Sequence, residues 1–153
     1  MRGDVTVYSS KNIICSMGTH IPSGFAEDSF ISVTPQGDGV TDEAGADGEV
    51  VISIPDDPRF EIKLVLQYGS KTNAWLMKQY NNNKQMPGSG IFNMQVKDLG
   101  QNPNFTASKA WVSKPAPIAY GKTAPTQEWT LRAVGKMDPK NLSLIHISEP
   151  TRP

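Results

Sequence analysis

The segment EIKLVLQY, residues 61–68, decides the fold because it has the strictest alternation of polar and apolar residues in the chain. A period of two residues predicts a β-strand with one buried face and one exposed face. Val65 is the one apolar residue on the outward face of this strand. The residues that we expect to point into the core are Ile62, Leu64, Leu66 and Tyr68.

The same period of two recurs on both sides of this strand, between segments that favour turns. The further predicted strands are residues 12–17, 29–34, 49–54, 91–96, 105–112 and 128–134. From residue 71 to 80 the period is that of a helix, with Ser70 as the predicted N-cap and Asn81–Asn83 as the predicted stop. The pattern predicts a mainly β domain, an antiparallel β-sandwich or barrel with one flanking α-helix.

Length and composition limit the class of protein. A chain of 153 residues is long enough for one domain with a single core, and its one cysteine excludes a disulfide framework. Lys and Arg number 15 and Asp and Glu also number 15, which disfavours binding to nucleic acid through excess positive charge. The sequence has no apolar signal core and no long apolar window, so we expect neither a signal peptide nor a membrane span.

The most unusual segment is an acidic, glycine-rich insert at residues 36–48. We expect it to join the strands at 29–34 and 49–54 as an oversized hairpin. Its size and polarity leave several roles open: a metal site, a phosphate cradle, a spacer, or an arm that contacts a neighbouring subunit. The spacing of its carboxylates does not fit a calcium loop. The candidate arm residues, in and just after the insert, are Asp38, Asp42, Glu43, Asp47 and Glu49.

No group of residues has the spacing of a catalytic or cofactor site. Cys15 falls on the apolar face of a predicted strand, where we expect a buried, inert thiol. His20 lies in a turn without an acidic partner nearby in sequence, and we expect it to be solvated. The adjacent Asp56 and Asp57 fit a turn better than they fit glycosidase chemistry. We therefore predict no enzyme activity, no catalytic residue, no bound metal and no cofactor.

The last twelve residues differ in pattern from the rest of the chain. Residues 142–152, LSLIHISEPTR, resemble the in-frame translation of the transposon-end adapter used to prepare sequencing libraries. We therefore assign residues 1–141 to the domain and residues 142–153 to a non-native tail, with a native C-terminal tail as the alternative. The assignment removes His146 from functional consideration and leaves His20 as the only histidine of the domain.

Four short motifs are spread along the chain: SGFA at 23–26, GADGEV at 45–50, TASKAW at 106–111 and EWTL at 128–131. With their surroundings they resemble the phage structural protein family that forms the tail tube of contractile-tailed phages. The resemblance spans about residues 7–134, nearly the whole domain. Residues 36–43 and 81–90 depart from the family pattern.

The resemblance implies a β-sandwich with a flanking helix, six copies closing into a ring with a shared inner barrel, and rings stacked as an inner tail tube. Such a tube conducts the genome without specific DNA binding. The implied partners are further copies of the chain and the tail sheath, tape measure, baseplate and tail-terminator proteins. The implied location is the virion tail, after assembly in the host cytoplasm. Under this interpretation, the acidic insert is an arm that contacts the next subunit or ring.

Other functions stay open. The tube of a phage-like contractile injection device would share the same fold and assembly. A carbohydrate-binding module would use Trp75, Trp111 and Trp129, and it requires these side chains to be exposed in one row. A small hydrolase would need an acid or base with a perturbed pKa in a pocket.

We predict that ending the chain at Asn141 leaves folding unchanged, because the removed residues have neither strand nor helix periodicity with which to dock. The thermal unfolding midpoints of the full and shortened chains check this. A fall of several degrees in the shortened chain, equivalent to about 1 kcal/mol or more, would show that the tail belongs to the domain.

Overall fold

The computed structural model describes residues 13–26, 30–100 and 102–139, and the predicted tail at 142–153 lies outside these residues. The described residues form eight strands and one helix. Their bounds are β1 Ile13–Met17, β2 Ile31–Pro35, β3 Thr41–Ala44, β4 Val50–Ser53, β5 Arg59–Leu66, α1 Thr72–Gln85, β6 Phe92–Asp98, β7 Asn104–Lys114 and β8 Gln127–Asp138. The expected mainly β architecture with one helix is confirmed.

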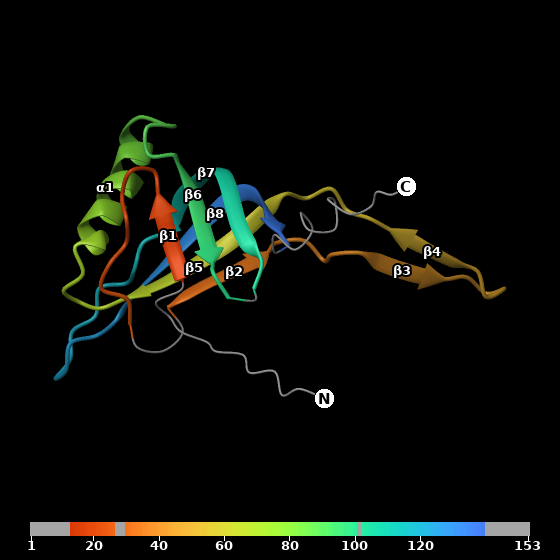
Figure 1. Ribbon diagram of the computed structural model, residues 1–153, viewed down its shortest axis with the longest axis horizontal. Coiled ribbons are helices and arrows are strands. Elements are labelled where there is room, and N and C mark those ends of the chain that lie inside the picture. The colour runs from red at the N-terminus through yellow and green to blue at the C-terminus, as the bar shows by residue number, and fades with distance from the viewer. Residues whose placement is uncertain (1–12, 27–29, 101, 140–153) are drawn as a thin grey trace, which may run out of the picture.

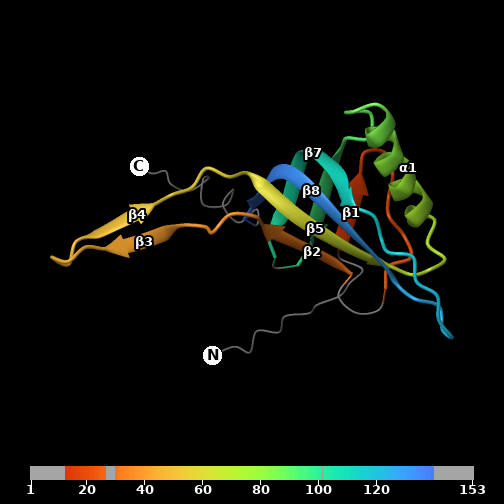
Figure 2. The same cartoon turned by 180° about the vertical axis from the view of Figure 1, so that it is seen from behind.

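Six strands form one antiparallel sheet in the order β1-β6-β7-β8-β5-β2. The sheet curls so that its two end strands, β1 and β2, approach each other across an open side, as in a half-barrel (Figure 1). The other two strands, β3 and β4, form a separate two-stranded sheet. This small sheet projects from one end of the body, and α1 lies at the opposite end (Figure 2).

The core fills the concave side of the curled sheet. Alternate residues of each body strand point inward, as the period of two predicts, and β5 shows this most clearly. Leu64 and Leu66 are completely buried, as predicted, whereas Tyr68 is 63% exposed because β5 ends at Leu66. The core residues are Cys15, Met17, Phe60, Ile62, Leu64, Leu66, Leu76, Phe92, Met94, Phe105, Ala107, Ala110, Val112, Ala116, Trp129, Leu131 and Ala133.

The curl has a local cause in β7 and β8. Their register shifts between Ala107 and Lys109 and again between Val112 and Lys114, and such bulges increase strand twist and bend. At the first shift, Gly135 of β8 lies so close to Thr106 and Ala107 that a Cβ atom there would overlap both. Its N–H also donates to the carbonyl of Pro58 at 3.1 Å. A glycine at this position therefore allows the close approach of β7 and β8.

Helix α1 is longer than predicted, because it continues through the asparagine run to Gln85. Met86 is extended and Pro87 follows, so the helix ends where proline disfavours a helical residue before it. Gly88, with φ 97°, then reverses the chain. Asn83 accepts hydrogen bonds from the N–H groups of Gly88 and Gly90 and fixes this turn from inside the helix. The prediction that the asparagines stop the helix was wrong. At the other end, the N-cap is Lys71 and not Ser70, so that prediction was wrong by one residue, although the Ser70 hydroxyl accepts from the N–H of Thr72.

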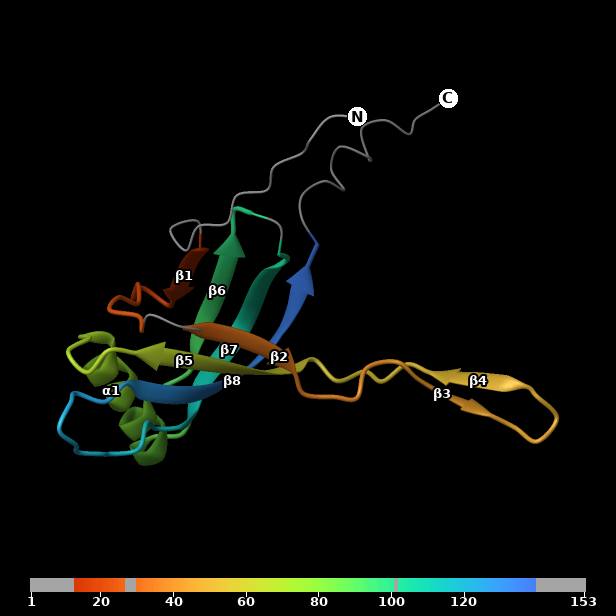
Figure 3. The same cartoon turned by 90° about the horizontal axis from the view of Figure 1, so that it is seen from below.

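The prediction that the strands at 29–34 and 49–54 pair with each other as a hairpin was wrong. Strand β2 pairs with β5, from Ile31 opposite Leu64 to Pro35 opposite Phe60. Strand β4 pairs with β3, which lies inside the acidic insert. The insert and the predicted strand at 49–54 therefore form the outer half of one long hairpin that begins as β2 and β5 (Figure 3).

Among the residues that the structure describes, no helix is both long and apolar enough to cross a membrane.

Changing Leu64 or Leu66 to Ala should lower the free energy of unfolding by about 2–5 kcal/mol, because each leaves a cavity in a fully buried site. Urea unfolding curves measure the loss. Lys63→Ala, on the exposed face of the same strand, is the control and should change stability by less than about 0.5 kcal/mol. Equal effects at inward and outward positions would contradict the assigned faces.

Candidate assembly arm and groove

The outer half of the long hairpin, residues 37–58, projects from the body and is called the arm. It begins where the N–H of Gln36 donates to the carbonyl of Arg59 at 3.0 Å, the last contact that continues the β2–β5 ladder. All of its residues are exposed. Figure 3 shows β3 and β4 extending away from the curled sheet, on the side opposite α1.

The tip of the arm is a tight turn within the GADGEV motif. The N–H of Gly45 donates to the carbonyl of Glu49 at 2.7 Å, and the N–H of Gly48 donates to the carbonyl of Gly45 at 3.0 Å. Gly48 has φ 90°, which suits the glycine of a three-residue hairpin loop. Asp47 accepts from the N–H of Glu49 at 3.2 Å. The motif therefore sets the register of the arm.

The two strands of the arm differ in chemistry. Strand β4 is Val-Val-Ile-Ser, and strand β3 is Thr-Asp-Glu-Ala. Asp42 lies opposite Ile52, and Glu43 lies opposite Val51, so each face carries both an acid and an aliphatic side chain. The ribbon thus has one acidic strand and one apolar strand, and the outer edge of each has no partner strand among the described residues. The aliphatic residues of the arm, 61% to 78% exposed, are Val40, Val50, Val51, Ile52 and Ile54.

The arm and the rest of the chain carry opposite charge. Residues 37–58 contain seven carboxylates and no Lys or Arg, so all 15 basic residues lie elsewhere with the remaining eight carboxylates. The predicted arm residues are on this projection, all exposed, with Asp42 and Glu43 on β3 and the others in the adjoining loops. None of the five forms an ion pair with another described residue. The structure therefore places them together on one element, Asp38, Asp42, Glu43, Asp47 and Glu49.

Within the part of the chain that the structure describes, one acid of the arm forms an ion pair, and it lies at the base of the arm. Asp57 accepts two hydrogen bonds from the guanidinium of Arg59, at 2.9 and 3.0 Å, and a third from the N–H of Arg59. These hydrogen bonds lower the pKa of the Asp57 carboxyl below its ordinary value. The prediction of a turn at Asp56 and Asp57 did not anticipate this link between arm and body.

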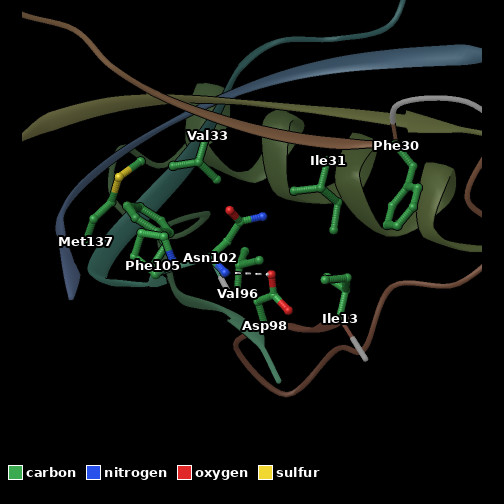
Figure 4. A pocket seen from close by; sticks show the side chains of 10 residues that line it. Ile13, Phe30, Ile31, Val33, Val96, Asp98, Asn102, Phe105 and Met137 are labelled. Carbon is green, nitrogen blue, oxygen red and sulfur yellow. Dashed lines mark hydrogen bonds between the residues drawn. The ribbon is translucent and has the colours of Figure 1, made fainter. Parts of the chain in front are cut away.

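A groove of about 420 Å³ lies on the open side of the half-barrel, between the end strands β1 and β2 (Figure 4). Ile31 and Val33 of β2 line one wall, and Ile13 of β1 with Val96 of β6 lines the other. The remaining lining residues are Phe30, Asp98, Asn102, Pro103, Phe105 and Met137. The groove could not be predicted from the sequence, because its walls come from segments that lie far apart in the chain.

Among the described residues that line the groove, Asp98 is the one with a charged side chain, and the local backbone satisfies it. Its carboxylate accepts from the N–H of Gly100 at 2.6 Å and from the N–H of Asn102 at 3.2 Å. The N–H of Asp98 in turn donates to the side chain of Asn104 at 3.0 Å. The carboxylate therefore shapes the loop after β6, and the groove is otherwise mainly apolar.

His20 is not the solvated histidine that the sequence predicts. Its ring stacks on Trp75 with the ring centroids 4.7 Å apart, and its Nε2 lies 2.9 Å from the hydroxyl of the buried Thr72. The same hydroxyl accepts from the N–H of Ser23 at 3.1 Å, and the tautomer of the His20 ring sets whether Nε2 accepts from this hydroxyl or donates to it. Burial lowers the pKa of His20. This cluster ties the segment after β1 to the helix.

The cysteine and the three tryptophans that were functional candidates from the sequence do not form a reactive or binding site among the residues that the structure describes. Cys15 is buried as predicted, and burial raises its pKa to about 12, which disfavours the reactive thiolate. Trp129 is 2% exposed, and its indole N–H donates to Asn73. Trp111 lies on the opposite face of the sheet, and Trp75 packs against Phe92. The three tryptophans do not form the exposed row that a sugar platform requires.

Within residues 13–26, 30–100 and 102–139, no cluster of three or more His, Cys, Asp or Glu side chains has a geometry that holds a metal ion. The carboxylates of the arm are spread along a ribbon, and their geometry does not converge on one point.

These features define a fold class: a half-barrel sheet closed at one end by a helix and extended at the other by a β-hairpin. No protein-family model matches the chain, and no curated protein matches it in sequence. Solved structures do share the fold, at low sequence identity.

One is the anti-feeding prophage cap, the AFP tube terminating cap, with a TM-score of 0.56 and 14% identity over 90% of this chain and 96% of that chain. A second is the sheath/tube terminator of PVC, an extracellular contractile injection system, with a TM-score of 0.58 and 13% identity over 89% and 99% of the two chains. A third is a chain of the PVC sheath-tube complex, with a TM-score of 0.53 and 14% identity over 86% and 90%.

Stability should fall as the pH drops below about 6.5, the ordinary pKa of histidine, in part because of His20. Its folded pKa is lowered, so the unfolded chain takes up the proton first, and its contribution is fully present only above that pH. Thermal unfolding midpoints at about pH 7.5 and about pH 5.5 measure the effect. His20→Gln should show the smaller fall between these two values. An identical fall in both proteins would contradict the neutral, hydrogen-bonded imidazole.

Proposed function

We propose that this chain is a structural subunit of a contractile phage tail or a tail-like injection particle, and that it assembles into rings that stack as the inner tube. In this proposal it is not an enzyme, it needs no cofactor, and its partners are further copies of itself together with sheath, baseplate, tape-measure and terminator proteins. It acts in the assembled tail, and the tube gives passage to a cargo such as the genome without binding it specifically.

The observation that carries the proposal is the exposed apolar edge of the arm. A two-stranded ribbon is marginally stable at best when it stands alone in water, and this one exposes aliphatic side chains along a free strand edge. Such an edge favours association with another protein surface. The opposite charges of arm and body favour another copy of the same chain as that surface.

The shared fold supports the same class of function. Two of the similar structures are tube-terminating proteins, and the third belongs to a sheath-tube complex. A terminator is therefore the second candidate. The two functions differ in self-assembly, because a tube subunit stacks ring on ring, whereas a terminator forms a ring that ends the stack. Negative-stain electron microscopy of the purified chain distinguishes tubes of varied length from single rings.

Replacing residues 37–58 by Asn-Gly should give a folded protein that forms neither rings nor tubes. The N–H of Gln36 donates to the carbonyl of Arg59, so the two residues already lie side by side where a two-residue turn would join them, and every residue removed is exposed. Thermal unfolding measures the body, and electron microscopy measures assembly.

The matched control keeps the arm at full length and changes Val50 and Ile52 to Thr. It should also fold normally, because both side chains are exposed, and it should assemble less than the unchanged chain. Tubes or rings formed as usual without the arm would contradict its function. An unfolded shortened protein would show that the arm is part of the domain core.

A further inference from the structure

We propose that the groove between β1 and β2 receives the arm of a second copy of the chain, with the apolar edge of β4 lying along the groove. This inference rests on the proposed function and names the surface that the arm binds.

The chemistry of the two surfaces matches. Strand β4 presents aliphatic side chains that its own fold does not bury. The groove presents an apolar lining that the described residues of its own chain do not fill. Bringing the two together removes both apolar surfaces from water, which is the main favourable term in protein association.

The backbone also favours a strand as the occupant. Strands β1 and β2 are the end strands of the sheet, so each has one edge without a partner strand among the described residues. They flank the groove on its two sides (Figure 4). A strand that enters between them can hydrogen-bond to an edge while its side chains fill the groove, as in other cases of strand addition.

The arm that fills the groove comes from another molecule. The arm continues β2 and β5, and the Gln36–Arg59 pair holds its base in line with them. It points away from the body (Figure 3), whereas the groove is lined by residues of the body strands, Ile31 and Val33 of β2 among them. Folding the arm back into its own groove would require breaking this part of the β2–β5 ladder.

The contact joins two different surfaces, and this has a geometric consequence. Each copy donates one arm and offers one groove, so the contact repeats from copy to copy. Heterologous contacts of this kind produce closed rings or open helical assemblies. The inference therefore explains how a single type of contact builds a ring or a stack.

The test uses two full-length variants that each lose one half of the contact. Ile52→Asp places a charge on the apolar edge of the arm and keeps the groove. Met137→Glu places a charge in the groove, at a residue that is 37% exposed, and keeps the arm. Each variant alone should be a folded monomer in size-exclusion chromatography and electron microscopy. Asn81→Glu, on an exposed position of α1, is the control and should assemble like the unchanged chain.

Mixing the two variants should restore one contact per pair. In an NMR titration, isotope-labelled Ile52→Asp protein should show shifts of its groove residues Ile31, Val33 and Val96 when unlabelled Met137→Glu protein is added. Unlabelled Ile52→Asp protein should cause no such shifts. Shifts confined to other surfaces, or no shifts in the mixture, would overturn the inference.

A second groove variant, Val33→Glu, guards against a folding defect in Met137→Glu, and melting curves identify which variants are folded. Normal assembly by the folded groove variants would show that the groove is not the receiving surface, as expected if residues 1–12 of the same chain fill it. That result would leave the proposed function standing. An unchanged chain that forms no rings or tubes would instead contradict the proposed function itself.

Discussion

The interaction on which this account depends is the burial of the β4 edge, which the monomer does not accomplish. The core of the body forms without the arm, because it is one cluster of buried residues that come from the body strands, α1 and the segment after β7. The arm has the opposite character, with aliphatic residues along a free edge and an excess of carboxylates beside them. An exposed apolar edge of this kind favours association with another protein surface, and the proposed function connects the fold to assembly on this basis.

The curl of the sheet forms the groove that we propose as the other side of that contact. Bulges in β7 and the close approach at Gly135 curl the sheet, and the curl leaves β1 and β2 facing each other across an apolar groove. The same β2 strand that borders the groove leads directly into the arm. In the proposed contact, the arm and the groove are therefore parts of one continuous structure, and a shift in the β2–β5 register would move both.

The body could be predicted from sequence because its strands obey a simple rule. In β5 and β8 an inward residue alternates with an outward one, so the pattern alone identified Leu64 and Leu66 as core. The pattern failed in the arm. Strand β3 is mostly polar and forms only by pairing with β4, and β4 has the composition of a core strand although it is exposed. Periodicity shows that a strand has an apolar side, but it does not show which molecule covers that side.

The groove was not predictable for a related reason, since its walls join residues from β1, β2, β6, β7 and β8. By contrast, the resemblance to tail-tube proteins and the acidic insert were visible in the sequence, and together they predicted an assembly arm. The structure adds the apolar edge, and thereby changes the expected chemistry of the contact from mainly ionic to mainly apolar with a charged border.

The most direct measurement is a cryo-electron microscopy reconstruction of the particle that the full-length chain forms. The account predicts that β3 and β4 are ordered, that Val50 and Ile52 are buried against another copy, and that this surface lies between β1 and β2. A reconstruction in which the arm extends into solvent, with both side chains uncovered, would contradict the account.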